Sequence, residues 1–190
     1  MTPPSFREMA LGVAGAFRLA RFDLSGLAFL DLTPRGAARS FWAAALVLPG
    51  YLALAGMRGD LDDTPTRPAE ARFVLEMLAY AVSWTAFPVV MSYLTEAAGR
   101  AHRFSAFLCA YNWAAVVQMA VYLPTALVAQ SGLLPPPAAS GLALGVVLAM
   151  LFYQWFVMRA TLSLTALGAA ALTLADLATA VAINAMVGQG

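Results

Sequence analysis

Two acidic side chains lie within segments that are otherwise apolar enough to cross a membrane. Asp176 lies near the middle of residues 162–187, and Glu76 lies a few residues inside 73–94. Because an ionised carboxyl is costly to bury in a bilayer, such residues are functional candidates by default. The chemistry open to them there is to bind or pass on a proton or a cation.

Asp176 has polar neighbours on its own helical face and at its own depth. Thr173 and Thr179 are three residues away on either side, which places them on the same face. Gln118, in the apolar segment 104–129, reaches a similar depth, and we expect it to form a hydrogen bond with Asp176. No arginine lies at that depth, which favours the neutral carboxyl. Two interpretations stay open: a carboxyl on a proton or cation route, or, preferred here, a neutral carboxyl that links two helices.

Three further polar residues complete the set of candidates. Glu76 is expected near the outer interface, where it forms an interfacial hydrogen bond or a pair with Arg72. Asn112 and Gln154 are expected in the opposite half of the bilayer, where two interpretations stay open: they bound a shared polar pocket, or, preferred here, the Trp and Tyr residues beside them anchor the spans at the interface. The candidate ligand or ion path therefore comprises Asp176, Gln118, Thr173, Thr179, Asn112, Gln154 and Glu76.

The sequence lacks the residues that most membrane enzymes need. Cys109 is its one cysteine and His102 its one histidine, which excludes an internal disulfide, a cysteine-rich zinc site and bis-histidine haem. It contains no Gly-x-Ser-x-Gly elbow, P-loop, dinucleotide fingerprint or His-Glu-x-x-His motif. We therefore expect no enzyme, no metal and no cofactor. The net charge of +1 offers no field that would bind nucleic acid.

The composition indicates that these residues act within a lipid bilayer. Of the 190 residues, 62% are apolar and only 11% are charged. Soluble domains carry about a quarter charged residues. Helices and closed barrels alone satisfy their backbone within lipid, and the apolar runs are too continuous for barrel strands. The fold class predicted is therefore all-α, a polytopic transmembrane helical bundle.

The hydropathy pattern divides the chain into an N-terminal region and a transmembrane domain. Residues 1–39 are expected at the membrane surface, because 5–21 repeat apolar residues at steps of three and four and carry arginines on the other side. A second short segment, 24–32, continues this layer. Residues 40–190 form the transmembrane domain, with a proline-containing loop at 130–139 and a tight turn at 159–161. The five predicted spans are 41–57, 73–94, 104–129, 141–158 and 162–187.

The placement of arginine predicts the orientation. With the N-terminus in the cytoplasm, eight arginines lie inside and three outside, as the positive-inside rule requires. The C-terminus is then periplasmic. All eleven basic residues are arginine and alanine is abundant, which is typical of a GC-rich bacterial genome. We therefore expect a multi-pass protein of the bacterial inner membrane.

The layout resembles that of the Yip1-like family of small multi-span membrane proteins. An amphipathic stretch, FREMALGVAGAFRLARFDLSGLAF, precedes about five closely spaced spans, and Pro49, Pro88 and Pro124 lie within three of them. The resemblance implies a protein that organises or partners with other membrane components. In the eukaryotic branch, the resemblance implies a vesicle-trafficking factor.

Two functions follow as hypotheses. The leading one is a non-enzymatic integral membrane protein that acts as a scaffold or accessory subunit. Its partners would be the lipid bilayer and other membrane proteins or a second copy, and Gly141 and Gly145 form a small-residue pair suited to close helix packing. The alternative is a small transporter or channel with a proton- or cation-linked path through Asp176 and Gln118.

Overall fold

The computed structural model describes residues 3–59, 62 and 68–188, and all regular structure in that part of the chain is helical. This confirms the predicted all-α class. The elements in chain order are α1 (Phe6–Ala20), the 3-10 helix η1 (Leu24–Phe29), α2 (Pro34–Ser40), α3 (Ala43–Arg58), α4 (Ala69–Ala97), α5 (Ala101–Gln130), α6 (Pro136–Leu162) and α7 (Ala166–Gly188).

Five helical segments are long and apolar enough to cross a membrane, as predicted. The first combines α2 and α3 into Pro34–Arg58, and the others are α4, α5, α6 and residues Ala166–Met186 of α7. The helices α4, α5 and α6 begin before and end after the predicted spans, because hydropathy detects the apolar centre of a helix and not its polar ends. Pro49, Pro88 and Pro124 lie inside α3, α4 and α5.

Two predicted connections are displaced in the structure. The loop predicted for 130–139 ends earlier, because Pro136 and Pro137 occupy the first turn of α6, where a helix does not need their missing N–H groups. At the other end, α6 continues to Leu162. Ser163, with φ 50°, adopts the left-handed conformation that ends the helix. The tight turn therefore lies at 163–165 and not at 159–161.

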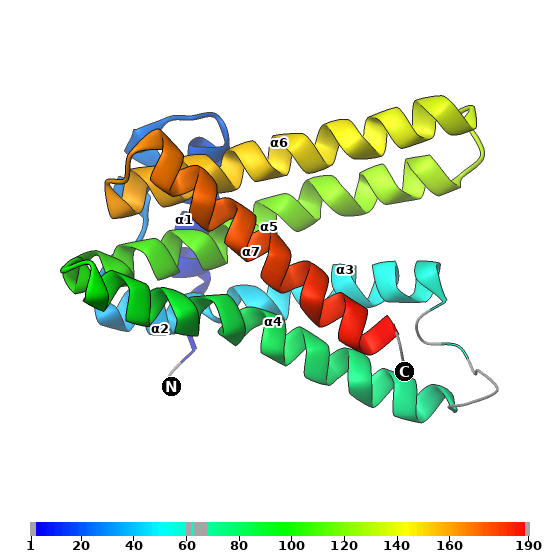
Figure 1. Ribbon diagram of the computed structural model, residues 1–190, viewed down its shortest axis with the longest axis horizontal. Helices are drawn as coiled ribbons and strands as arrows, with labels where there is room; N and C mark the ends of the chain where they lie inside the picture. The colour runs from blue at the N-terminus through cyan, green and yellow to red at the C-terminus, as the bar shows by residue number, and fades with distance from the viewer. Residues whose placement is uncertain (1–2, 60–61, 63–67, 189–190) are drawn as a thin grey trace.

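The long helix α5 is the centre of the bundle. It packs against α6, α3, α4 and the N-terminal helices α1 and α2. The last helix, α7, contacts α6 and α4. Figure 1 shows α7 crossing the bundle obliquely, from the α6–α7 turn toward the end of the bundle where α4 begins. Because of this oblique course, α7 covers one side of the bundle formed by the other spans.

The N-terminal helix α1 has two different faces. Ser5 and Glu8 form a capping box at its start, with Ser5 N donating to Glu8 Oε2 at 2.6 Å and Glu8 N donating to Ser5 Oγ at 3.2 Å. The face buried against the bundle consists of small residues and Leu19, whereas Phe6 and Phe17 of the predicted apolar face are 83% and 49% exposed. An exposed aromatic face is what a helix at the lipid surface needs, but its position in the membrane stays a prediction.

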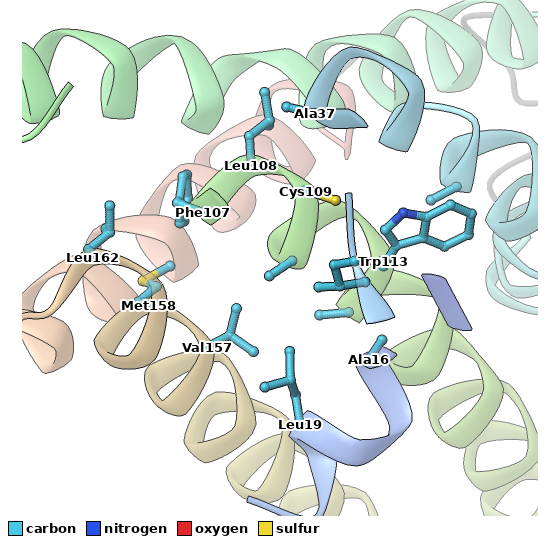
Figure 2. Close-up of a cluster of buried hydrophobic side chains, with 14 of the residues drawn as sticks. Ala16, Leu19, Ala37, Phe107, Leu108, Cys109, Trp113, Val157, Met158 and Leu162 are labelled. Carbon is cyan, nitrogen blue, oxygen red and sulfur yellow. The ribbon is translucent and has the colours of Figure 1, made fainter. Parts of the chain in front are cut away.

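The dry core lies where α1 meets α5 and α6. Figure 2 shows Leu19 of α1 close to Val157 and Met158 of α6, with Trp113 of α5 nearby. Tyr153 donates from its hydroxyl to the carbonyl oxygen of Ala16 at 2.8 Å, which joins α6 to α1. At 1.5 Å per residue, α5 is about 45 Å long against about 30 Å of hydrocarbon, so it has the length to support α1 outside the apolar layer.

Candidate functional site: a polar cavity beside α7

A cavity of about 470 Å³ lies between the spans, with lining residues from α3, α4, α5, α6 and α7. Most of its lining is apolar, but five polar residues other than tyrosine face it. Among the lining residues there is one acid and no base. The polar ones are Ser83, Gln118, Gln154, Asp176 and Thr179, and the aromatic ones are Tyr51, Tyr80, Trp84, Phe87, Tyr111 and Tyr122.

Asp176 is held in this cavity by a tyrosine. The hydroxyl of Tyr111 on α5 donates to Asp176 Oδ1 on α7 at 2.8 Å, and both residues line the cavity. The ring of Tyr111 is itself fixed by Phe87 and Phe107, whose centroids lie 5.7 Å and 5.3 Å away. The second carboxylate oxygen, Oδ2, has no hydrogen-bond partner among the described residues.

The predicted hydrogen bond between Gln118 and Asp176 is wrong. Gln118 Nε2 donates to Gln154 Oε1 on α6 at 3.0 Å, and Asp176 pairs with Tyr111 instead. The reason is the oblique course of α7, which brings Asp176 opposite a residue two turns nearer the start of α5. Even so, both residues line the same cavity, so the structure places the predicted pair in one site without a direct bond.

The second carboxyl, Glu76, reaches the cavity through another tyrosine. Tyr51 of α3 donates from its hydroxyl to Glu76 Oε2 of α4 at 2.5 Å. Glu76 is 5% exposed, so its side chain is buried where α4 meets α3. The predicted partner Arg72 donates to the carbonyl oxygen of Gly59 at 3.3 Å. Because Tyr51 lines the cavity, each intramembrane carboxyl is bonded to a cavity-lining tyrosine.

Asn112 does not belong to this site, so the pocket predicted between Asn112 and Gln154 is wrong. Asn112 is fully buried and donates from Nδ2 to Ser40 Oγ at 2.8 Å, toward α2. Successive residues of a helix point about 100° apart, which turns Asn112 away from the face that Tyr111 presents to the cavity. Its Oδ1 has no hydrogen-bond partner among the described residues.

The two predicted threonines take different positions. Thr179 lines the cavity and donates to the carbonyl oxygen of Ala175 at 2.8 Å. Thr173 is buried outside the lining and donates to the carbonyl oxygen of Ala169 at 2.9 Å. Only Thr179 therefore belongs to the polar wall of the cavity.

Tyr51 and Tyr111, the hydrogen-bond partners of the two carboxyls, are residues of this site that the sequence analysis did not predict. For Tyr51 a signal is present: it follows the Pro49-Gly50 pair in the middle of an otherwise apolar span. A hydroxyl buried in lipid needs a partner, and across a bundle that partner is most often on another helix.

The remaining reactive side chains lie apart from the cavity. Cys109 is buried in the dry core, and His102 is exposed in the first turn of α5. Among the described residues no three of the types His, Cys, Asp and Glu are close enough together to hold a metal ion. What the cavity offers is a carboxyl with a free oxygen, amides and hydroxyls, all in an apolar surround: groups that accept a proton or attract a cation.

Comparison of the chain with family models, with curated proteins and with solved structures finds no match. The similarity in layout to the Yip1-like family accordingly stays a prediction. The geometry of the cavity is the basis for the functional argument.

Proposed function

We propose that this integral membrane protein is a small transporter or channel that passes protons or cations through the cavity beside α7. The observation that carries the proposal is the position of Asp176: the one acidic lining residue faces the cavity, and its Oδ2 has no partner in the part of the chain that the structure describes. A carboxyl that served only to link two helices would be expected to lie in a dry helix contact. Asp176 instead borders a space of about 470 Å³.

The distribution of polar groups supports a route along the bundle. Asp176 lies ten residues from the start of the 23-residue helix α7, and Glu76 lies seven residues from the start of α4. The wall of the cavity also carries Ser83, Gln118 and Gln154. Each carboxyl accepts from a tyrosine hydroxyl, and Tyr51 and Tyr111 both line the cavity, so a proton or cation in the cavity is close to both carboxyl–tyrosine pairs.

The setting of this function follows from the sequence. We place the protein in a bacterial inner membrane, with the N-terminus cytoplasmic and the C-terminus periplasmic, because eight of the eleven arginines then lie inside. On this orientation Glu76 is nearer the periplasm. The proposed role requires no catalytic group and no cofactor.

The test is flux in proteoliposomes with a matched carboxyl-to-amide control. Purified protein is reconstituted, a membrane potential is imposed, and the uptake of protons, Na⁺ and K⁺ is followed with entrapped dyes. Uptake of at least one of these ions should exceed that of protein-free vesicles. The variant Asp176→Asn should fall to the protein-free level, whereas Glu96→Gln, exposed in the last turn of α4 and outside the cavity, should keep the parent rate.

Both variants must elute as the parent does in gel filtration, so that a loss of flux is not a loss of folding. Flux of the parent no greater than that of empty vesicles would overturn the proposal. Equal flux of Asp176→Asn and the parent would remove Asp176 from the path.

A scaffold or accessory subunit is the second candidate, and one observation favours it. A side chain added at Gly141 or Gly145 of α6 would meet nothing within 4 Å, so this part of α6 is open to another helix. Small residues at such a face let two membrane helices approach closely. If the scaffold function is correct, Gly145→Leu should remove partners that co-purify with the parent in mild detergent and leave ion flux unchanged. Unaltered co-purification would contradict it.

A further inference from the structure

We infer that the ligand of the cavity is a lipophilic organic monocation, such as a quaternary ammonium or phosphonium compound with aromatic or aliphatic substituents. This rests on the proposed function and names the class of cation that the site takes. Three properties of the wall support it: its charge, its aromatic surface and its size.

The charge of the wall fits one positive charge. Among the described residues, Asp176 is the one acidic residue of the lining, and no arginine or histidine faces the cavity. Asp176 Oδ2 has no hydrogen-bond partner among these residues. A buried carboxylate is stabilised when an opposite charge is brought to it, and a buried anion near it would be repelled. A monocation therefore balances the site, whereas an anionic ligand adds a second uncompensated charge.

Aromatic rings form two groups in the wall of the cavity. In the first, Tyr51 lies 4.7 Å from Tyr80, and Tyr80 lies 6.0 Å from Trp84, measured between ring centroids. In the second, Phe87 and Tyr111 lie 5.7 Å apart, and Tyr111 is the residue bonded to Asp176. All five rings line the cavity. Ring faces carry negative electrostatic potential and attract organic cations, tryptophan most strongly.

The size and the aliphatic part of the wall exclude a bare metal ion as the best ligand. A volume of about 470 Å³ is in the range of sites for drug-sized molecules. Small hard cations need several oxygen ligands, and Gln154 Oε1 already accepts from Gln118 Nε2. Met119, Met150 and Ile183 add apolar surface that a hydrated ion cannot use. An organic cation satisfies both parts of the wall.

The experiment compares two ions of nearly equal shape and opposite charge. Binding of tetraphenylphosphonium and of tetraphenylborate is measured by equilibrium dialysis against the protein in phosphatidylcholine nanodiscs, with empty nanodiscs as background. We expect saturable binding of tetraphenylphosphonium that tetraphenylborate does not compete. Asp176→Asn should weaken this binding by about tenfold or more, because it removes the one group of the wall that can carry a negative charge opposite the cation.

A second pair of variants tests the aromatic surface without touching the carboxyl. Trp84→Leu should weaken tetraphenylphosphonium binding by roughly threefold to thirtyfold, the loss expected for one cation–π contact in a desolvated site. Tyr93→Leu is the matched control, since Tyr93 is an aromatic residue of the same helix that is 70% exposed and outside the cavity. It should bind as the parent does.

The outcomes separate this inference from the proposed function. Equal binding of both tetraphenyl ions, or binding unchanged by Asp176→Asn and Trp84→Leu, would overturn the organic-cation assignment and indicate a site for an uncharged apolar ligand. Selective binding of tetraphenylphosphonium without ion or tetraphenylphosphonium flux in proteoliposomes would keep the assignment and contradict transport. Asp176-dependent flux of small ions without tetraphenylphosphonium binding would do the reverse.

Discussion

The contact between α1 and α5 provides a quantitative test, because Gly12 leaves no room for a side chain. A Cβ atom at position 12 would lie 2.3 Å from Cε2 and 2.5 Å from Cδ2 of Trp113. Ordinary carbon contacts are about 3.5–4.0 Å, so the indole would have to move by about 1 Å or more. Trp113 is 5% exposed and belongs to the hydrophobic core. Gly12→Ala should therefore weaken the docking of α1.

The magnitude follows from two opposing effects. Overpacking a filled core costs about 1–3 kcal/mol, and replacing a helical glycine by alanine gains up to about 1 kcal/mol. Gly56 of α3 is the control, since a Cβ there meets nothing within 4 Å and only the gain applies. We expect Gly12→Ala to be less stable than Gly56→Ala by about 1–3 kcal/mol.

The assay is unfolding in mixed micelles, with SDS titrated into a mild detergent and the fluorescence of Trp113 as one of the signals. The free energy of unfolding of both variants is compared with that of the parent. If Gly12→Ala were as stable as Gly56→Ala, Trp113 would not be packed on Gly12, and the described position of α1 would be wrong.

Three further predictions concern local structure. Ser163 has φ 50°, so Ser163→Gly should raise and Ser163→Val should lower the free energy of unfolding, each by about 1 kcal/mol, in the same titration. Ser40→Ala removes the acceptor of Asn112 and should cost about 1 kcal/mol, again by SDS titration; no loss would contradict that buried hydrogen bond. The backbone N–H and the hydroxyl of Ser5, and then Arg39, lower the pKa of Glu8 from its ordinary 4.5. Its contribution is therefore present above pH 4.5 and lost as the pH falls through the lowered pKa, so the stability difference between the parent and Glu8→Gln should vanish at strongly acidic pH.

The spans could be predicted from the sequence because a bilayer requires long runs of apolar residues, and α4, α5 and α6 each contain one. Their ends could not. Hydropathy does not register Pro136 as the first residue of a helix or Ser163 as the residue that ends one. Both depend on backbone conformation at a single position.

The face of α1 that packs on the bundle could not be predicted from the sequence for a different reason. A hydrophobic pattern selects large residues such as Phe17, whereas the face that docks on the bundle is made of Gly12, Gly15, Ala16 and Leu19. Close approach of two helices favours small side chains, which carry little hydrophobic signal. Which face of α1 packs on the bundle depends on whether its large residues face lipid or protein.

Four of the seven residues predicted for the ligand or ion path line the cavity, namely Asp176, Gln118, Gln154 and Thr179, whereas Thr173, Asn112 and Glu76 do not. That these residues form a path stays a prediction. The bond from Tyr111 to Asp176 depends on the angle at which α7 crosses α5, and a single sequence does not carry that angle. The hydrogen bond from Tyr51 to Glu76 was likewise not predicted, because Tyr51 lies on another span.

The most direct test of the central claim, that the cavity beside α7 is a water-reachable site for cations, is cysteine accessibility along α5. In a Cys109→Ala background, Gln118→Cys places a thiol in the cavity, and Ala120→Cys places one on the exposed face two residues on. The reaction rates with a cationic and an anionic methanethiosulfonate reagent are measured on the protein in nanodiscs. We predict that Cys at position 118 reacts faster with the cationic reagent, that Asp176→Asn removes this preference, and that position 120 reacts with neither. No reaction at 118, or a charge preference that Asp176→Asn leaves unchanged, would contradict the account.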